Sequence, residues 1–259
     1  MARTICWFSC GAASGVATKL LLSSASDRTD IRVVYIETGS EHPDNERFLT
    51  DCEVWFGQSI LRLKSPLYTD TFDVWRKRRY MSGPNGAPCT KELKFVPRLD
   101  YQLPSDLHVW GYTADAADKK RADRMLAEYP LMKQRNPLIE RGLTKANVLA
   151  MVQSVGIELP AMYGLGFHNN NCIGCVKSTS PAYWALVRKH FPERFGEIAD
   201  LSRELGARLV ITGQEKGDDG KRRNIRAFID EIPADHPTTN PIAPACDFLC
   251  QHAEEDMAA

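Results

Sequence analysis

The sequence predicts an α/β fold, with a parallel twisted sheet, helices on both of its faces, and a helical, cysteine-bearing C-terminal part. Two observations lead to this prediction. Apolar runs of strand length alternate with helix-period segments through the first half of the chain, and this alternation is typical of parallel sheets with right-handed crossovers. In the second half helical segments dominate, and a Cys-x-x-Cys pair stands among them.

The elements of the first half follow in order. An apolar run from Ile5 to Phe8 predicts the first strand, and a helix-like segment at 14–22 follows a short loop. Later apolar runs predict strands, and the segments between them predict helices, one of which begins near Pro43, a residue suited to a first helical turn. The expected strands lie at 31–36, 60–63 and 107–112, and the expected helices at 43–56 and 114–128.

The second half changes character. We expect a helix at 144–155 capped by Thr144, an irregular stretch at 164–180, helices at 181–190 and 192–205, and a strand at 208–212. The chain from Asp218 onward is charged and then rich in proline, so we expect an extended tail. The predicted domains are a nucleotide-binding α/β part at 1–135 and a helical and extended part at 136–259, packed as one unit.

Composition narrows the class of protein. The 259 residues are 43% hydrophobic and 25% charged, with a formal net charge of +0, so no global attraction to nucleic acid is expected. Basic clusters exist locally, at 76–79, 119–121 and 221–226. No apolar run reaches the roughly 18–20 residues of a membrane span, and we expect a cytoplasmic protein. In such a reducing compartment the eight cysteines are better candidates for metal ligation or chemistry than for disulfides.

The loop after the first strand is a candidate phosphate site. It is built from small residues, so backbone N–H groups can approach a phosphate, and the following helix adds its dipole. No Gly-Lys-Ser/Thr follows, so it is not the common phosphate loop; an ordinary strand–helix turn is the alternative. Its candidate binding residues are Ser9, Cys10, Gly11, Ala12 and Ser14.

Other polar residues follow the predicted strands, at the sheet edge where ligands of such folds bind. Glu37, Thr38 and Gly39 are candidates for contact with the nucleoside, and Gly111 and Tyr112 follow a later strand. Cations that suit a polyphosphate or an anionic substrate stand nearby in the sequence, and a capped loop and an amphipathic helix are the plain alternatives. These cations are Lys91, Lys94, Arg121 and Arg124.

Cysteines give the strongest metal-type signal. Cys172 and Cys175 form a Cys-x-x-Cys pair, which suits a redox dithiol, half of a zinc site or part of an iron–sulfur site. Cys89 stands alone, and Cys246 and Cys250 lie in the tail. The spacing fits no simple zinc ribbon. Cys6 and Cys52, in contrast, sit in apolar or helical patterns that suit buried structural thiols.

Taken together, these segments resemble the phosphoadenosine-phosphosulfate (PAPS) reductase family, of the Rossmann-type, adenine-nucleotide α-hydrolase-like fold of the PP-loop pyrophosphatases. The resemblance spans about residues 4–205. The chain most closely resembles the PAPS-reductase-like proteins of phages, plasmids and DNA-modification systems, because Tyr183-Trp184 follows the Cys-Ile-Gly-Cys-Val-Lys segment. The matching segments are Ser9–Ser14, Tyr35–Gly39, Cys89–Lys94, Gly111–Asp115 and Asn170–Lys177.

The resemblance implies ATP with Mg²⁺ at the small-residue loop, the nucleoside at Thr38 and Gly39, and a [4Fe–4S] cluster, with zinc as the alternative metal. The implied cluster ligands are Cys89, Cys172, Cys175 and, from the tail, Cys250 or Cys246.

Two departures from the family pattern matter. Ala13 replaces the acidic residue of the loop, so Mg²⁺ would need Glu37, Glu41 or Asp115. The chain also has no Glu-Cys-Gly-Leu-His segment, which carries the reactive cysteine of the assimilatory reductases.

The leading functional hypothesis is an ATP-dependent sulfur transferase that adenylates an acceptor and inserts sulfur with the help of the cluster. The expected partners are an adenine nucleotide, a tRNA or DNA acceptor, a sulfur donor such as a cysteine desulfurase, and a second copy of the chain in a homodimer, with no membrane. The alternatives are a reductase of sulfonucleotides such as PAPS or APS, and a non-catalytic nucleotide-binding, zinc-stabilised interaction protein.

Overall fold

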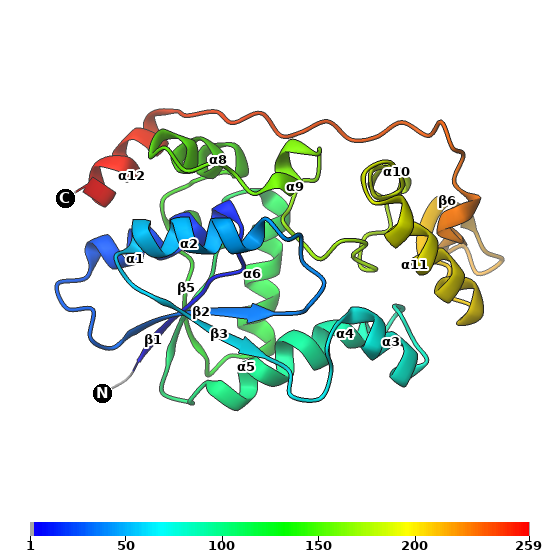
Figure 1. Cartoon of the computed structure of the whole chain (residues 1–259), viewed down its shortest axis with the longest axis horizontal. Helices are drawn as coiled ribbons and strands as arrows, with labels where there is room; N and C mark the ends of the chain where they lie inside the picture. Colours follow the sequence, from blue (N-terminus) through cyan, green and yellow to red (C-terminus); the bar gives the residue numbers. More distant parts are fainter. Residues whose placement is uncertain (1–2, 259) are drawn as a thin grey trace.

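A five-stranded parallel sheet with strand order β3-β2-β1-β4-β5 organises the computed structural model, which describes residues 3–258 (Figure 1). Strands β2 and β4 lie on opposite sides of the central β1, so the chain builds one side of the sheet with β2 and β3 and the other side with β4 and β5. Such a switch point opens a crevice beyond the carboxyl ends of the strands. The predicted fold class is confirmed. The strands are β1 (Thr4–Trp7), β2 (Ile31–Glu37), β3 (Ile60–Lys64), β4 (Leu107–Val109) and β5 (Lys133–Arg135).

Helices cover both faces of this sheet. On one face, Cys6 of β1 and Phe8, the residue just after β1, pack in a core with Val16 and Leu20 of the first helix. On the other face, Ile5, Trp7 and Val34 pack with Tyr101. The helices of the first core are α1 (Ala12–Ser24), α2 (Asn45–Phe56), α7 (Pro137–Glu140), α8 (Lys145–Ser154) and α12 (Phe248–Ala258). The opposite face is covered by a π-helical turn, η1 (Lys91–Phe95), which continues into α5 (Val96–Tyr101), while α6 (Ala116–Glu128) follows β4.

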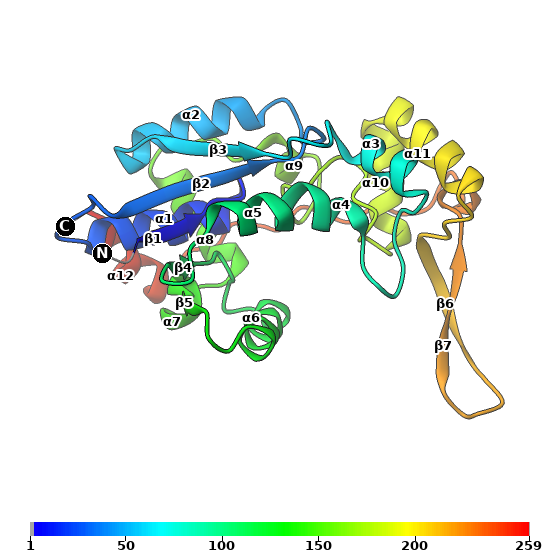
Figure 2. The same cartoon turned by 90° about the horizontal axis from the view of Figure 1, so that it is seen from below.

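A second core lies beyond the carboxyl ends of the strands (Figure 2). It buries Trp75 and Trp184 completely or nearly so, and it joins segments from both halves of the chain. The core on the sheet also includes α7, α8 and α12 from the second half of the chain. The boundary between the two cores therefore does not coincide with the predicted domain boundary at residue 135. The elements around the second core are α3 (Thr71–Arg78), α4 (Pro88–Thr90), α9 (Ala161–Gly164), α10 (Pro181–His190), α11 (Pro192–Glu204), β6 (Val210–Lys216), β7 (Arg222–Ala227) and the 3₁₀ turn η2 (Ile229–Glu231).

The tail differs most from its prediction. The expected extended segment after Asp218 contains strand β7 and helix α12. Strand β7 was missed because it is polar on both faces, and α12 because it contributes few apolar residues to the sheet core: Cys250, Ala253 and the partly buried Met257. Thr144 caps α8 as predicted, through a reciprocal capping box with Asn147. None of the described helices is both long and apolar enough to cross a membrane.

Candidate functional site

The small-residue loop joins β1 to α1. Its conformation is fixed by Ser14, whose hydroxyl accepts a hydrogen bond from Ser9 N (3.0 Å) and donates one to the Gly11 carbonyl (3.0 Å). Cys10 adopts a left-handed backbone conformation with φ 56°, and Gly11 is the N-cap of α1. The first N–H groups of a helix have no acceptor within the helix; the Tyr163 hydroxyl takes that of Ala12, and the others, with the positive end of the α1 dipole, are suited to an anion.

Residues from the second half of the chain lie over this loop. The Tyr163 hydroxyl accepts a hydrogen bond from Ala12 N (3.3 Å) and another from Lys145 Nζ (3.1 Å). Asn170 Nδ2 donates to the Cys10 carbonyl (2.5 Å). Lys145 therefore brings a cation to the first turn of α1. No local sequence signal points to Lys145 or Tyr163, because both reach the loop only through tertiary packing.

Gly111 lies directly against the loop. A Cβ atom at this position would be 2.6 Å from Ser14 Cα and 2.7 Å from Ser14 N, closer than real atoms pack. Only glycine therefore lets the chain after β4 approach the start of α1. The predicted residues after β1 and after β4 are thus brought together at the switch point. Tyr112, the next residue, is half-buried, and burial raises its pKa.

The loop after β2 faces the cysteines rather than open space. Thr38 is buried, and its hydroxyl lies 3.0 Å from Cys172 Sγ and 2.5 Å from Glu41 Oε1. Gly39 has φ 68°, and a Cβ there would be 2.1 Å from the Thr69 carbonyl oxygen. Glu37 and Gly39 line a cavity of about 310 Å³ together with residues 64–69, Asp73 and Lys77. The side chain of Thr38 is thus engaged with Cys172, whereas Glu37 and Gly39 border open space at the end of β2.

Three carboxylates could replace the missing loop acid in holding Mg²⁺. Glu41 already accepts hydrogen bonds from Thr38 N (2.9 Å) and Ser40 N (3.1 Å) in addition to the Thr38 hydroxyl. Asp115 accepts from the Thr113 hydroxyl (2.7 Å) and Lys145 N (2.8 Å). Glu37 instead lines the cavity at the end of β2. Of the three, Glu37 has the position best suited to a cation bound with a nucleotide.

Three of the predicted cysteine ligands gather around Lys94. Desolvation lowers the pKa of the Lys94 ammonium, but the charges of Cys172, Glu41, Cys175 and Cys89 outweigh this effect and raise it. Burial raises the pKa of Cys172 to about 11 although Lys94 opposes the shift, and burial also raises the pKa of Cys89. Both thiols are therefore protonated near neutral pH unless a metal binds, because a coordinated thiol loses its proton.

Neighbouring groups hold the Cys-x-x-Cys turn in place. Cys175 N donates to the Tyr183 hydroxyl (2.7 Å), and Ile173 N donates to the Ser40 carbonyl (2.9 Å). The indole N–H of Trp75 lies close enough to Cys89 to lower the pKa of that thiol, but within the described residues this buried N–H makes no hydrogen bond of full geometry. An unpaired buried donor is costly, and a thiolate at Cys89 would satisfy it.

The three thiols are not arranged around a single zinc position. Within residues 3–258, the sulfur atoms of Cys89, Cys172 and Cys175 do not form a set whose members all lie within 4.8 Å of one another. Tetrahedral zinc with Zn–S bonds of about 2.3 Å needs sulfurs roughly 3.8 Å apart. A wider set of thiols, a nearby cation and a free N–H donor suit an anionic iron–sulfur cluster.

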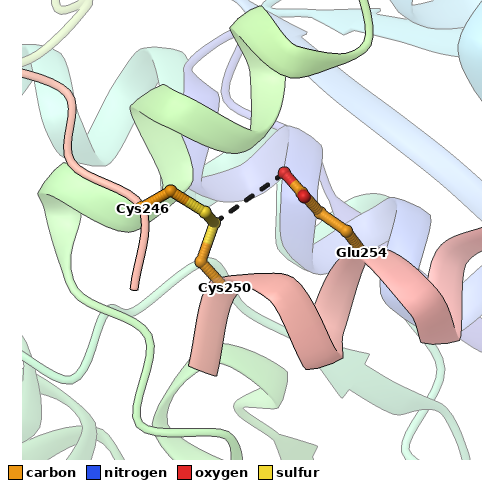
Figure 3. A group of neighbouring side chains, drawn as sticks. All are labelled: Cys246, Cys250 and Glu254. Atoms are coloured by element: carbon orange, nitrogen blue, oxygen red, sulfur yellow. Dashed lines mark hydrogen bonds between the residues drawn. A yellow bond between two sulfur atoms is a disulfide. The ribbon is translucent and has the colours of Figure 1, made fainter. Parts of the chain in front are cut away.

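The tail cysteines are not part of this site. Cys246 and Cys250 form a disulfide with a Cα–Cα distance of 5.4 Å, and Figure 3 shows Glu254 beside it. Ala245 is hydrogen-bonded to α8, and Cys250 belongs to the sheet core, whereas Cys89 packs against the second core. The expectation that Cys250 or Cys246 supplies the fourth ligand is therefore wrong, as is the expectation that the tail pair stays reduced.

All four predicted cations have exposed side chains, and Lys94 differs from the others in lying close to the cysteines. Lys91 is exposed on η1. Arg121 forms an ion pair with Asp118 (2.9 Å), and Arg121 and Arg124 line a hollow of about 530 Å³ along α6. Lys94, at the cysteines, is therefore the predicted cation for which a role in the site is best supported.

One short segment joins the two halves of the site. Asn170 contacts the phosphate loop at Cys10 and donates to Asn45 Oδ1 (2.8 Å), and two residues later Cys172 contacts Thr38. The loop, the end of β2 and the cysteines are therefore neighbours. The chain is thus a parallel α/β protein in which the small-residue loop and three candidate cysteine ligands lie together at the switch point of the sheet.

Comparison with solved structures adds evidence of a structural likeness. No family model matches the chain, and neither does any curated protein. The chain is similar to the crystal structure of a phosphoadenylyl-sulfate (PAPS) reductase from Candida auris in a phosphate complex, with 13% sequence identity and a TM-score of 0.49. The match covers 66% of this chain and 82% of that chain. At this identity and TM-score the likeness is weak, and the fold rests on the described sheet itself.

Proposed function

We propose that the chain is an ATP-dependent sulfur transferase, in which the small-residue loop binds ATP and Cys89, Cys172 and Cys175 hold a [4Fe–4S] cluster. The observation that carries this proposal is the segment 170–172, which contacts the phosphate loop through Asn170 and the end of β2 through Cys172. Because the anion-binding loop and the cysteines are neighbours, an acceptor activated at the loop would be within reach of sulfur held at the cysteines.

The loop half would activate the acceptor. Backbone N–H groups at the start of α1 and the Lys145 ammonium would hold the phosphates, and Glu37 would bind Mg²⁺ beside the nucleoside. An acceptor oxygen attacks the α-phosphorus, the bond to pyrophosphate breaks, and an adenylate forms. Sulfur at the oxidation level of sulfide then attacks the activated carbon, and AMP departs with the oxygen. This displacement itself involves no oxidation or reduction, and sulfur that arrives as the persulfide of a desulfurase would first be reduced to sulfide by two electrons from a thiol reductant.

The cysteine half would hold the sulfur. With three protein thiolates and no ligand from the tail, a bound cluster would supply one iron with an open coordination position for a sulfur ligand. Lys94 would balance the negative charge of the thiolates, and Trp75 would donate its indole N–H to Cys89. The proposed acceptor is a tRNA or DNA component, and the proposed donor of sulfur is a cysteine desulfurase.

The test separates the two halves. Under anaerobic conditions, wild-type protein should release pyrophosphate from ATP only when the acceptor is present, and should incorporate sulfur. Cys172→Ser should retain pyrophosphate release and lose sulfur incorporation, and Lys145→Met should lose both. The double variant Cys246→Ser/Cys250→Ser is the matched control and should retain both. Release of sulfite from PAPS by a thiol donor, without ATP, would replace this proposal with the reductase alternative.

A further inference from the structure

The β6–β7 hairpin projects away from the second core (Figure 2). Its strands pair antiparallel, and every residue from Arg222 to Arg226 is exposed, as are Gln214, Glu215 and Lys216 opposite them. A two-stranded ribbon with no buried face gains little from folding. The outer part of this hairpin therefore contributes almost nothing to the core, and packing stability does not explain why the chain forms it.

The hairpin is basic in a chain whose net charge is +0. Residues 208–226 contain six Lys or Arg and three Asp or Glu. Arg223 is paired with Asp219 (3.3 Å), but Lys216 and Arg222 form no ion pair within the described part of the chain. The cations are Arg208, Lys216, Lys221, Arg222, Arg223 and Arg226. Positive charge left unpaired on a projecting ribbon is suited to an anionic partner.

The unpaired cations share one face with two amides. The register pairs Lys216 with Arg222 and Gln214 with Asn224, and side chains two residues apart lie on the same face of a strand. Gln214 Nε2 donates to Asn224 Oδ1 (3.0 Å), which confirms that these two lie together. We call Gln214, Lys216, Arg222 and Asn224 the Gln–Arg face. The opposite face carries Glu215, Arg223 and Ile225.

We propose that the β6–β7 hairpin is a docking arm for double-stranded DNA, with the Gln–Arg face in the major groove. Arg and Lys recognise guanine and phosphate, and Asn and Gln recognise adenine. Two strands about 4.8 Å apart fit a major groove about 12 Å wide. The major groove of A-form RNA is too narrow for side chains to read. A protein partner would need an apolar centre, and Ile225, 44% exposed, is the one large apolar side chain from Gln214 to Arg226.

The base of the arm is tied to the cysteine site. Ile211 N donates to the Thr179 carbonyl (2.9 Å), and Ser178 N donates to the Cys175 carbonyl (2.9 Å). DNA held by the arm would therefore lie on the side of the molecule that carries the Cys-x-x-Cys turn. Double-stranded DNA would then be the acceptor class of the proposed function. The arm rests on that function only for the sulfur-transfer chemistry, because DNA binding can be measured without it.

Fluorescence anisotropy with a labelled 20-base-pair DNA duplex tests the arm. Lys216→Gln/Arg222→Gln should weaken binding at least tenfold and reduce the slope of log affinity against log salt by about 2, one for each lost phosphate contact. The matched control is Lys119→Gln/Lys120→Gln, which removes two exposed cations from α6 and should leave affinity unchanged. Unfolding temperatures of all three proteins should agree, because none of the four side chains is buried.

Three results would overturn the proposal: equal affinity of wild type and the hairpin variant, equal loss in the α6 control, or binding of an RNA duplex as tight as that of DNA. Failure of the proposed function gives a different pattern. If the arm binds DNA but neither DNA nor tRNA stimulates pyrophosphate release from ATP, the sulfur-transferase chemistry is refuted and the arm stands.

Discussion

Gly111→Ala is the substitution that probes the phosphate loop most cleanly. The added Cβ would lie 2.6 Å from Ser14 Cα and 2.7 Å from Ser14 N, so backbone rather than a flexible side chain must move. The backbone at Gly111 does not have a positive φ, so this contact is the source of the penalty. Overpacking of this kind costs about 1–3 kcal/mol. If the start of α1 shifts to relieve it, the affinity for ATP falls by about 5- to 150-fold.

Isothermal titration calorimetry with ATP and Mg²⁺ measures this effect. The matched control is Gly196→Ala in α11, where an added Cβ meets nothing within 4 Å. That variant should bind ATP like wild type and gain about 0.5–1 kcal/mol of stability, because alanine is the better helix former. Gly111→Ala protein that is folded and binds ATP with wild-type affinity would refute the assignment of this loop as the phosphate site.

Three further predictions follow from other contacts. Lys145→Met should weaken ATP binding about 10- to 150-fold, since a charge-assisted hydrogen bond contributes about 1.5–3 kcal/mol, whereas Lys189→Met on α10 should have no effect in the same titration. Burial opposes ionisation of Asp106, but hydrogen bonds from Arg3 and Leu103 N hold its pKa below the usual range. Its contribution is therefore present above the unfolded pKa of about 3.9 and is lost as the pH falls through the folded pKa. Urea unfolding should show a weaker dependence on acid for Asp106→Asn than for wild type, and parallel curves would contradict this. Reducing the Cys246–Cys250 disulfide should cost about 2 kcal/mol, from closure of a short loop, with no change in ATP affinity; a loss of ATP affinity would mean that the tail acts on the loop.

The sheet and the residues after its strands could be predicted from sequence, because buried parallel strands appear as short apolar runs. Gly111 and the loop at Ser9–Ser14 were placed at one edge by that reasoning, and the structure brings them into contact. The grouping of Cys89 with Cys172 and Cys175 came from the resemblance rather than from spacing, and Lys94 joins them.

The residues that were missed depend on tertiary packing. Lys145 and Tyr163 reach the loop from helices 130 or more positions away in the chain, and nothing in their local sequence points there. Cys250 was misassigned because spacing alone cannot show that α12 packs on α1 and α8, away from the other cysteines. The hairpin was missed because a ribbon exposed on both faces has no alternation of apolar and polar residues.

Iron and acid-labile sulfide content of anaerobically purified protein tests the three-cysteine centre most directly. Wild type and Cys246→Ser/Cys250→Ser should each contain about four iron and four sulfide per chain, with broad absorption near ~400 nm that fades in air. Cys172→Ser should lose most of both. A colourless wild-type protein with one equivalent of zinc and no iron would contradict the cluster, as would iron that disappears only when the tail cysteines are replaced.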